Sequence, residues 1–514
     1  MATKNNSYER KIKTREELIE AIGPRPRNKK VIMCHGTFDL VHPGHIRHLM
    51  YAKSKADILI ASLTSDPHIK KADYRPFVPQ DLRAMNLAAL EMVDYVIVDG
   101  NETPLENLAA IQPDFFAKGY EYGKEGLHPK TQEEVNVLES YGGEVLFTPG
   151  DIVYSSSFVI ENNPPNLTAE KLQILMQGEG ITFDDLKNAL GSMKGVRVHV
   201  VGDTIVDTYT YCTLIGGMTK TPTFSLRYDH HKDYVGGAGI VAKHLCKAGA
   251  EVRFTTVLGD DELKNYVLKD LQEYGVKCNA VIDPTRPTTQ KNVFTASNYR
   301  MLKVDKLDNR SISDKILKKF KEEISSSEED IIVFSDFRHG IFNQRTIADM
   351  IAAIPEKILK VADSQVASRW GNILDFQNFD LITPNEKEAR FSLGDQDSTV
   401  RPLAMDLFIK SKCKLLILKL GERGSITYRA PSPEARSFFI LDSFTKNVVD
   451  AVGSGDAFLS YASLAFFKTQ NSVIASILGA MAAAAACENE GNIPVSPDDV
   501  MKKIQKFEKE IRYE

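Results

Sequence analysis

Two histidines three positions apart, His42 and His45, lie where an apolar run gives way to a helical pattern. Residues 31–34 predict a buried strand, and residues 46–52 predict a helix. A helix N-terminus presents free N–H groups and the positive end of the helix dipole, which together suit a phosphate. Both rings can donate to that phosphate from the same side. We expect the preceding turn to approach the same group, through Gly36, Thr37 and Phe38.

A second anion-binding pattern lies near the C-terminus, at Gly453-Ser454-Gly455-Asp456. Backbone N–H groups at the start of the helix expected over 457–466 can face a transferring phosphoryl group. The carboxylate of Asp456 then lies beside that group and can take the proton of an attacking hydroxyl. The pattern therefore predicts phosphoryl transfer with Asp456 as the base.

The first pattern fits nucleotidyl transfer, in which a phosphate attacks the α-phosphate of a nucleoside triphosphate. Such a reaction needs alignment and charge neutralisation more than covalent help from the protein. Basic residues in the expected loops, and a run of serines before residue 158, can supply both. These candidates for nucleotide binding are Lys70, Arg75, Arg83, Lys118, Ser155, Ser156 and Ser157.

The second pattern has candidate partners earlier in the chain. Asp203 and Asp207 end or follow an apolar run, where carboxylates can hold sugar hydroxyls, and Gly236 and Gly237 can bring the backbone close to a sugar. The spacing of Asn385 and Glu388 can organise Mg²⁺ and phosphates through water, with Glu388 as the metal-side carboxylate. A loop after a further apolar run fits the edge of a nucleotide, through Lys419, Gly421 and Gly424.

Composition excludes several other classes of function. The formal net charge is -5 and the basic residues are spread along the chain, which gives no support for nucleic-acid or membrane-surface binding. Six cysteines form no C-x-x-C pair, and the polar N-terminus lacks the apolar core of a signal peptide. We therefore expect a cytoplasmic protein with reduced cysteines that acts on small molecules.

Apolar runs alternate with helical patterns through most of the 514 residues, which predicts an α/β fold with parallel sheets. Ligands bind at the carboxyl ends of strands in such sheets, where both anion-binding patterns lie. The polar segment 161–166 contains two prolines and reads as a domain exit. We expect a nucleotidyltransferase domain over 1–162, a linker with helices over 163–194, and a kinase domain over 195–514.

The motifs of residues 30–160 resemble the nucleotidyltransferase domain of the bifunctional heptose enzymes of ADP-heptose synthesis. The resemblance is carried by the turn and histidines described above, by Arg75-Pro76, and by Lys118-Gly119 with Tyr122. Glycerol-phosphate cytidylyltransferases share the first motif, but their aromatic-glutamate-glycine segment is absent. This chain departs from the heptose type at 123–132, an apparent insertion, and at 155–157, where three serines replace Ser-Thr-Thr.

The motifs from residue 196 onward resemble ribokinase-like sugar kinases, and most closely the kinase half of the same heptose enzymes. The resemblance implies a Rossmann-like N-terminal domain, a ribokinase-like C-terminal domain with a small β lid, and dimerisation through that lid. It also implies Mg²⁺ and ATP as cofactors, Asp456 as the catalytic base and Lys303 as a sugar contact.

Two departures concern the sugar, and a third concerns the order of the domains. Ile240 stands where the family's G-G-A-x-N motif has a sugar-contacting asparagine, and Asp363-Ser364-Gln365 replaces Asp-Pro-Lys. The order of the two domains is the reverse of the usual one. Reaction types therefore carry over from the resemblance, whereas the identity of the sugar or sugar phosphate does not.

The expected function is phosphorylation of a sugar or sugar phosphate, and coupling of a sugar-1-phosphate to a nucleoside triphosphate with release of pyrophosphate. The product is a nucleotide-activated sugar, as in ADP-heptose synthesis. Two alternatives stay open at this point. The transferase half can use CTP and form a CDP-activated sugar or polyol, or one half can be inactive and serve as a regulatory nucleotide-binding module.

Overall fold

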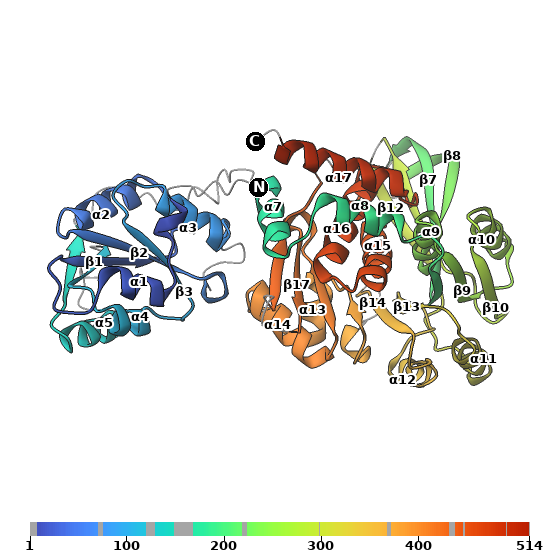
Figure 1. Ribbon diagram of the computed structural model, residues 1–514. Helices are drawn as coiled ribbons and strands as arrows, with labels where there is room; N and C mark the ends of the chain where they lie inside the picture. The colour runs from blue at the N-terminus through green and yellow to red at the C-terminus, as the bar shows by residue number, and fades with distance from the viewer. Residues whose placement is uncertain are drawn as a thin grey trace. The chain divides into compact units, whose positions relative to one another are not determined.

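The structure is a computed structural model that describes residues 8–69, 76–119, 129–148, 168–217, 224–297, 299–366, 372–430, 437–445, 448–489 and 491–512. The chain divides into two compact units, Met1–Leu167 and Thr168–Glu514 (Figure 1). Each unit has its own sheet and its own apolar core. Within the described ranges, no helix is both long and apolar enough to cross a bilayer.

The N-terminal unit is built on a five-stranded sheet with the strand order β3-β2-β1-β4-β5. All four strand pairs are parallel. The order changes direction between β1 and β4, which makes the carboxyl end of β1 a switch point where ligands bind in such folds. The strands are β1 (Val31–Gly36), β2 (Ile58–Thr64), β3 (Tyr95–Asp99), β4 (Phe115–Gly119) and β5 (Glu144–Thr148).

Helices cover both faces of this sheet, because alternate residues of β1 point to opposite sides. Ile32 and Cys34 pack in the cluster that contains Leu49 and Leu87, whereas Val31 and Met33 pack in a second cluster. Burial on both faces explains the continuous apolar runs in the sequence. The helices are α1 (Arg15–Ile22), α2 (Pro43–Lys53), α3 (Gln80–Ala88), α4 (Leu105–Ile111) and α5 (Pro129–Glu139).

The C-terminal unit has a nine-stranded sheet with the order β10-β9-β6-β13-β14-β15-β16-β17-β18. The strands are parallel from β10 to β16, and β17 and β18 continue the edge in antiparallel pairing. Their bounds are β6 (Arg197–Gly202), β9 (Glu251–Leu258), β10 (Lys277–Ile282), β13 (Ile331–Asp336), β14 (Leu359–Ser364), β15 (Leu381–Ile382), β16 (Leu415–Lys419), β17 (Ser425–Arg429) and β18 (Phe438–Leu441).

Helices cover both faces of the nine-stranded sheet as well. One large core cluster includes residues of the first two and the last three helices of the unit, and a second cluster lies on the other face. The helices are α7 (Thr168–Gly178), α8 (Phe183–Gly191), α9 (Ala238–Lys247), α10 (Glu262–Glu273), α11 (Asp314–Ser325), α12 (Gln344–Ala352), α13 (Glu386–Leu393), α14 (Val400–Ser411), α15 (Ser454–Thr469), α16 (Ser472–Cys487) and α17 (Pro497–Arg512).

The two helices expected in a linker, α7 and α8, pack within the C-terminal unit. Leu172 and Met176 of α7, and Leu186 and Leu190 of α8, are buried in its larger core cluster. Two ion pairs add to this packing, because Lys171 contacts Asp442 at 3.0 Å and Arg429 contacts Glu179 at 2.6 Å. The first compact segment of this unit therefore begins at Thr168.

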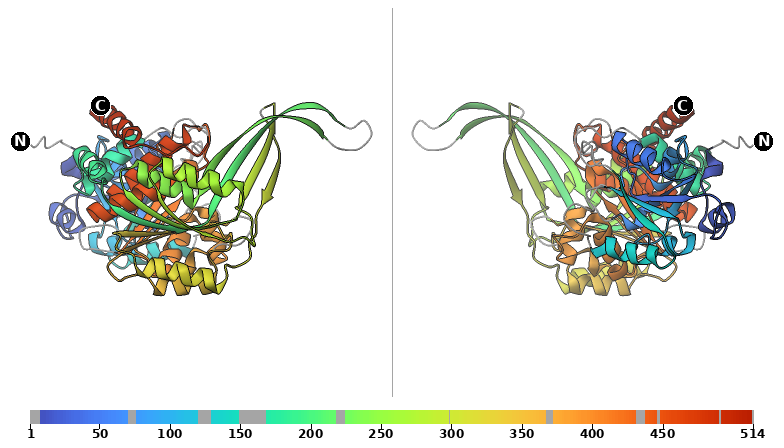
Figure 2. Two further views of the ribbon diagram at one scale, coloured as in Figure 1. Left: turned by 90° about the vertical axis from the view of Figure 1, so that its right-hand side faces the viewer. Right: turned by 90° about the vertical axis from the view of Figure 1, so that its left-hand side faces the viewer.

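A separate four-stranded sheet, with the order β12-β11-β7-β8, forms a lid on the C-terminal unit. Its long strands β7 (Thr204–Gly217) and β8 (Phe224–Gly237) pair antiparallel and extend beyond the rest of this unit (Figure 2). Strand β11 (Gln290–Ala296) pairs parallel with β7, and β12 (Tyr299–Lys306) pairs antiparallel with β11. The β lid expected from the sequence is therefore present, and it is longer than the two short segments that suggested it.

Candidate active sites

The two histidines of the N-terminal unit lie at the start of α2, directly after the carboxyl end of β1. His42 is the N-cap residue, and its Nδ1 accepts a hydrogen bond from the N–H of Gly44 at 3.1 Å. The His42 and His45 rings stack with centroids 3.9 Å apart. The helix start, the switch point of the sheet and the two rings thus meet at one place, as the sequence predicts.

Backbone partners fix the tautomers of both rings. Because the N–H of Gly44 can only donate, Nδ1 of His42 is unprotonated and its Nε2 carries the proton. Nδ1 of His45 lies 3.1 Å from the carbonyl oxygen of Leu40, which can only accept, so this nitrogen carries the proton. Burial, with smaller contributions from His42 and His48, lowers the pKa of His45 to about 4. Neutral His42 can therefore donate to a phosphate through Nε2, whereas His45 must first gain a proton.

Arg83 does not face a ligand in this structure. Its side chain is 0% exposed, and its guanidinium donates to the carbonyl oxygens of Thr37, Thr64 and Val78 and pairs with Asp66 at 2.7 Å. An arginine with its donors committed in this way holds backbone in place. The sequence expectation that Arg83 contacts the nucleotide stays a prediction, and the geometry favours a role in positioning Thr37.

Asp39 was not singled out in the sequence, although it lies within the Gly-Thr-Phe-Asp turn. It is buried and accepts hydrogen bonds from the N–H groups of Phe77 at 3.0 Å and Val78 at 2.8 Å. Phe38, directly before it, has a φ of 47°. This left-handed conformation is uncommon for a bulky residue and is maintained only where the surroundings enforce it. The turn after β1 is therefore held rigidly against the loop before α3.

Lys118 lies at the carboxyl end of β4, the neighbour of β1 in the sheet. Its Nζ forms an ion pair with Glu134 and lies 3.4 Å from the hydroxyl oxygen of Thr131. The phosphate contact expected of Lys118 stays a prediction, since its ammonium pairs with Glu134 in this structure. Five further candidates, Lys70, Arg75, Ser155, Ser156 and Ser157, lie outside the described residues.

In the C-terminal unit, Asp456 is in the first turn of α15 and is buried. The helix begins at Ser454, three residues earlier than the sequence pattern suggests, and Gly453 precedes it with a φ of 77°. Glycine adopts this conformation without strain, which lets the chain enter the helix directly after the turn. The free N–H groups of the helix start and the Asp456 carboxyl group therefore lie together, as a phosphoryl-transfer site requires.

Asp456 belongs to a buried group of charges. Burial, together with the neighbouring Asp363, raises the pKa of Asp456 to about 8, although Lys419 opposes the shift. Burial and Asp363 also raise the pKa of Glu388. Carboxyl groups brought together in an apolar setting resist ionisation, and a group near neutrality is suited to accept a proton during the reaction.

Lys419 is the cation at the centre of this group. It ends β16, its Nζ lies 3.0 Å from Asp363, and a methyl group at Gly455 would lie 3.3 Å from that nitrogen. Burial lowers its pKa, but the carboxylates of Asp363, Glu388 and Asp456 raise it by more, so the net shift is upward. Lys419 therefore carries its charge directly beside the turn that leads into α15.

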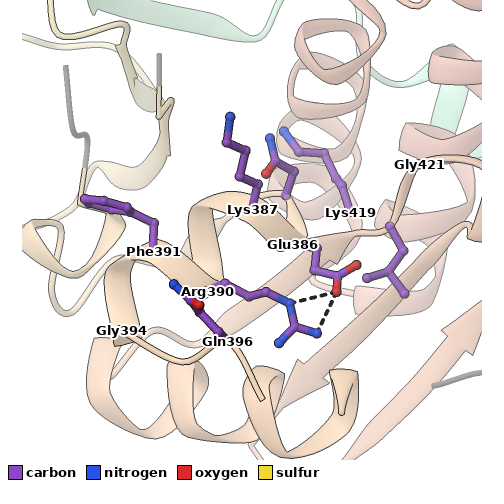
Figure 3. A pocket seen from close by; sticks show the side chains of 10 residues that line it. Glu386, Lys387, Arg390, Phe391, Gly394, Gln396, Lys419 and Gly421 are labelled. Atoms are coloured by element: carbon purple, nitrogen blue, oxygen red, sulfur yellow. Dashed lines mark hydrogen bonds and ion pairs between the residues drawn. The ribbon is translucent and has the colours of Figure 1, made fainter. Parts of the chain in front are cut away.

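Two pockets meet at Lys419 and Gly421. The larger one, of about 680 Å³, lies beside the start of α13, and Lys387 and Lys419 extend toward the same side of it (Figure 3). The smaller one, of about 200 Å³, is lined mainly by apolar side chains such as Val448 and Phe458, with Gly424 at its edge. The cationic side chains of the larger pocket suit the phosphates of a nucleotide, and the apolar lining of the smaller one suits its base.

Asn385 and Glu388 form a capping box at the start of α13. The Asn385 side chain accepts the N–H of Glu388 at 2.9 Å, and a Glu388 oxygen accepts the N–H of Asn385 at 2.7 Å. Among the described residues, no three carboxylate, histidine or cysteine side chains converge as a metal cage. Mg²⁺ in such sites is held by one or two carboxylates together with water and substrate phosphates. The carboxylate oxygens of Glu388 and Asp363 are possible metal ligands of this kind. They lie beside the larger pocket, which suits the phosphates of a nucleotide.

Asp203 has a structural task that the sequence does not reveal. Its carboxylate accepts the backbone N–H groups of Phe337 at 3.1 Å, His339 at 3.2 Å and Ile341 at 3.4 Å. Its two oxygens therefore hold the loop after β13. The predicted contact of Asp203 with a sugar stays a prediction, and the geometry favours a positioning role.

Asp207, by contrast, lies among groups that can meet a substrate. One of its oxygens accepts a hydrogen bond from Nδ2 of Asn492 at 2.8 Å, and a methyl group at Gly236 would lie 2.2 Å from that oxygen. Gly236 is thus in close contact with Asp207, and Gly237, with a φ of 60°, leads into α9. Asp207 and Asp456 also interact electrostatically, which places the predicted sugar contacts next to the predicted base.

Two lysines of the lid complete this end of the site. Lys291 of β11 is paired in register with Asp207 of β7, and Lys303 of β12 lies opposite Val293. Burial lowers the pKa of Lys291, and the nearby Lys303 adds to this effect while Asp207 opposes it. Lys303 was expected here, whereas Lys291 and Asn492 were not predicted from the sequence.

The fold and the sites together define a two-domain enzyme of phosphate-group transfer, with a sugar-kinase fold after a nucleotidyltransferase fold. The profile of the pfkB family carbohydrate kinases matches residues 197–499, and the chain belongs to that family. The cytidylyltransferase-like profile matches residues 33–162. The expected fold class and the unusual order, with the transferase first, are confirmed.

Relatives share part of the chain. The bifunctional protein HldE of Pelobacter propionicus is 36% identical over 148 residues, which are 28% of this chain and 29% of that protein. HldE of Campylobacter jejuni is 40% identical over 121 residues, 23% of this chain and 26% of that protein. The similarity thus spans less than a third of the length of these relatives.

Solved structures match the C-terminal unit's fold. Phosphofructokinase-2 of Escherichia coli in complex with substrates and products has a TM-score of 0.52 and 19% identity, over 61% of this chain and 100% of that chain. The same enzyme in complex with fructose-6-phosphate has a TM-score of 0.51 and 17% identity, over 61% and 99%. At this identity the comparison shows the fold, and the sites described above must carry the function.

Proposed function

We propose that this chain is a bifunctional enzyme that makes a nucleotide-activated sugar. Its C-terminal half phosphorylates a sugar or sugar phosphate with ATP, and its N-terminal half couples a sugar-1-phosphate to a nucleoside triphosphate, as in ADP-heptose synthesis. The observation that carries the proposal is the buried Asp456 in the first turn of α15, beside Lys419 and Gly455. The stacked histidines at the start of α2 support the second activity.

In the kinase half, Asp456 takes the proton of the sugar hydroxyl while that oxygen attacks the γ-phosphorus of ATP. The bond between the γ-phosphorus and its bridging oxygen breaks, and ADP leaves. The N–H groups at the start of α15 and the ammonium of Lys419 stabilise the negative charge of the transferring group. Bound Mg²⁺ would neutralise charge on the nucleotide phosphates, with Glu388 as its carboxylate partner.

In the transferase half, a phosphate oxygen of the sugar-1-phosphate attacks the α-phosphorus of the nucleotide, and pyrophosphate leaves. His42 donates to the phosphate through the proton on Nε2, and His45 donates once it has gained a proton. The N–H groups at the start of α2 add to this stabilisation.

We propose a phosphorylated sugar, of the heptose phosphate type, as the substrate of the kinase half. Lys291 and Lys303 both interact electrostatically with Asp207 and with each other. Two lysines near a buried carboxylate favour a substrate that brings negative charge of its own. ATP and CTP both stay open as the nucleotide of the transferase half.

We further propose a homodimer formed through the lid. The lid carries exposed apolar and aromatic side chains on three of its strands, namely Leu214 and Ile215 on β7, Phe224 and Tyr228 on β8, and Tyr299, Leu302 and Val304 on β12. Exposed apolar surface on this scale marks an interaction site.

The six unpaired cysteines support a reducing, cytoplasmic setting.

The test measures both half-reactions of the purified chain. We expect ADP formation from ATP with a panel of sugars and sugar phosphates, and pyrophosphate release from ATP or CTP with the matching sugar-1-phosphates. Release with CTP alone would move the product to a CDP-activated sugar or polyol. Absence of both reactions across the panel would refute the proposal, and absence of one would make that half a binding module.

A further inference from the structure

Asn492 lies inside the kinase site, although neither motif nor spacing predicted it. It follows α16 in the chain, and its side chain is 5% exposed. Its Nδ2 donates to Asp207 at 2.8 Å. A methyl group at Gly236 would lie 2.9 Å from Nδ2, and one at Gly453 would lie 2.6 Å from Oδ1. The amide therefore spans the gap between the sugar-side glycines and the turn that leads to Asp456.

The oxygen end of this amide has no hydrogen-bond partner among the described residues. Oδ1 of Asn492 is buried, and no described residue donates a hydrogen bond to it. A buried acceptor left unpaired costs about 1–3 kcal/mol, so such groups are usually paired by a neighbour, a water or a ligand. The orientation of the amide is set by Asp207, whose oxygen accepts a hydrogen bond from Nδ2. Burial raises the pKa of Asp207, whereas Lys291, Lys303 and this hydrogen bond favour its ionised form, which can only accept. Oδ1 is thus the atom presented to a substrate.

The segment that carries Asn492 is fixed in place. Gly491 has a φ of 81°, and its N–H lies 3.4 Å from a carboxylate oxygen of Asp450. Val495 is bonded on both sides, since its N–H donates to His244 at 3.1 Å and its carbonyl accepts the hydroxyl of Tyr461 at 2.9 Å. Because these hydrogen bonds hold the segment in place, the Asn492 amide is preorganised for binding a ligand.

Position 240, where related kinases have a sugar-contacting asparagine, offers no amide in this chain. Ile240, in the first turn of α9 after Gly236 and Gly237, is completely buried and has no polar group to offer. The amide of Asn492, which comes from the other end of the unit's sequence, lies beside Gly236 instead.

We propose that Asn492 is a specificity-determining residue of the kinase site, whose Oδ1 accepts a hydrogen bond from one hydroxyl of the sugar while Nδ2 holds Asp207. The inference rests on the proposed kinase function and deepens it. The substrate it implies carries a free hydroxyl adjacent to the one that is phosphorylated, because Asn492 contacts both Asp207 and the turn before Asp456.

The test pairs protein variants with deoxygenated substrates. Asn492→Leu replaces the amide by an apolar side chain of similar branched shape. Asn489→Leu is the control, because among the described residues the Asn489 side chain bonds the carbonyl of Ala485 at the end of α16 and no group of the site. The probes are a heptose phosphate and its monodeoxy analogues, or the panel sugar that the wild type phosphorylates fastest. Direct binding of each probe is measured alongside kcat/KM.

We expect Asn492→Leu to lower kcat/KM for the sugar by about 10- to 100-fold, with little change in the KM for ATP. One deoxy analogue should lose a similar factor with the wild type and lose nothing further with the variant. Asn489→Leu should behave as the wild type. Asn492→Ala and thermal unfolding of each variant separate this effect from misfolding.

Three results would overturn the assignment. One is wild-type kcat/KM in the folded Asn492→Leu and Asn492→Ala variants. Another is a full penalty for every deoxy analogue in those variants, which would mean that Asn492 contacts no hydroxyl. A wild type that neither binds nor phosphorylates any panel sugar would overturn the kinase function as well, whereas normal wild-type activity with unaffected variants would overturn the role of Asn492 alone.

Discussion

The charge state of Asp456 makes a quantitative prediction for the kinase half. A base must be ionised to accept a proton, and the pKa of Asp456 is raised to about 8 before nucleotide binds. About 1% of the carboxyl groups are then ionised at pH 6 and about 90% at pH 9, so kcat/KM for ATP should rise about 90-fold over this range. The sign follows from the raised pKa, since activity is lost as the pH falls through it.

The assay is ADP formation at ATP concentrations well below KM and saturating sugar, between pH 6 and pH 9. The acid limb of kcat should lie at lower pH than that of kcat/KM, because cations that accompany the bound nucleotide favour the ionised carboxylate. Asp456→Asn should lose a factor of about 10²–10⁴ in kcat and keep pyrophosphate release by the other half. A flat kcat/KM profile, or an Asp456→Asn variant with wild-type kcat, would refute the assignment of the base.

Three further outcomes follow from the structure. Binding of a nucleoside triphosphate to the N-terminal half near pH 7 should be accompanied by uptake of a proton at His45. Calorimetry in buffers of different ionisation enthalpy would show this uptake, which should be absent in His45→Asn. Equal proton uptake in that variant would contradict the role of His45. Lys419→Met should destabilise the C-terminal unit by about 3 kcal/mol, because it leaves the buried Asp363 without its cation. Adding Asp363→Asn should restore stability but not kinase activity, and unchanged unfolding of the single variant would argue against the pair. Asp203→Ala should lower the unfolding temperature more than Asp207→Ala, since it frees three backbone N–H groups; the reverse order would remove its positioning role.

The sequence was informative where function depends on local order along the chain. Apolar runs and helical patterns predicted the parallel α/β units, and motifs at strand ends predicted the positions of His42, His45 and Asp456. Each of these residues acts through its own turn, helix start and neighbouring strand. Such relations are encoded within a dozen residues, so a single sequence is enough to find them.

The remaining features depend on partners that are distant in sequence. Asp207 and Asn492 are 285 positions apart, and no local pattern links them. Arg83 and Asp203 carry charges that suggest ligand binding, yet both are committed to backbone groups of other loops. Whether a charged residue faces a ligand or holds a loop is decided by packing, which the residue type alone does not reveal.

The packing of α7 and α8 has a practical consequence for separating the two activities. These helices bury Leu172, Met176, Leu186 and Leu190 in the main core of the kinase unit. A kinase fragment that begins near residue 195 would leave the surface under them exposed to water, and apolar surface of that kind promotes aggregation. A fragment that begins at Thr168 retains α7 and α8 on this surface. Loss of kinase activity in a shorter fragment would then report a missing part of the fold, and not a dependence of the kinase on the transferase half.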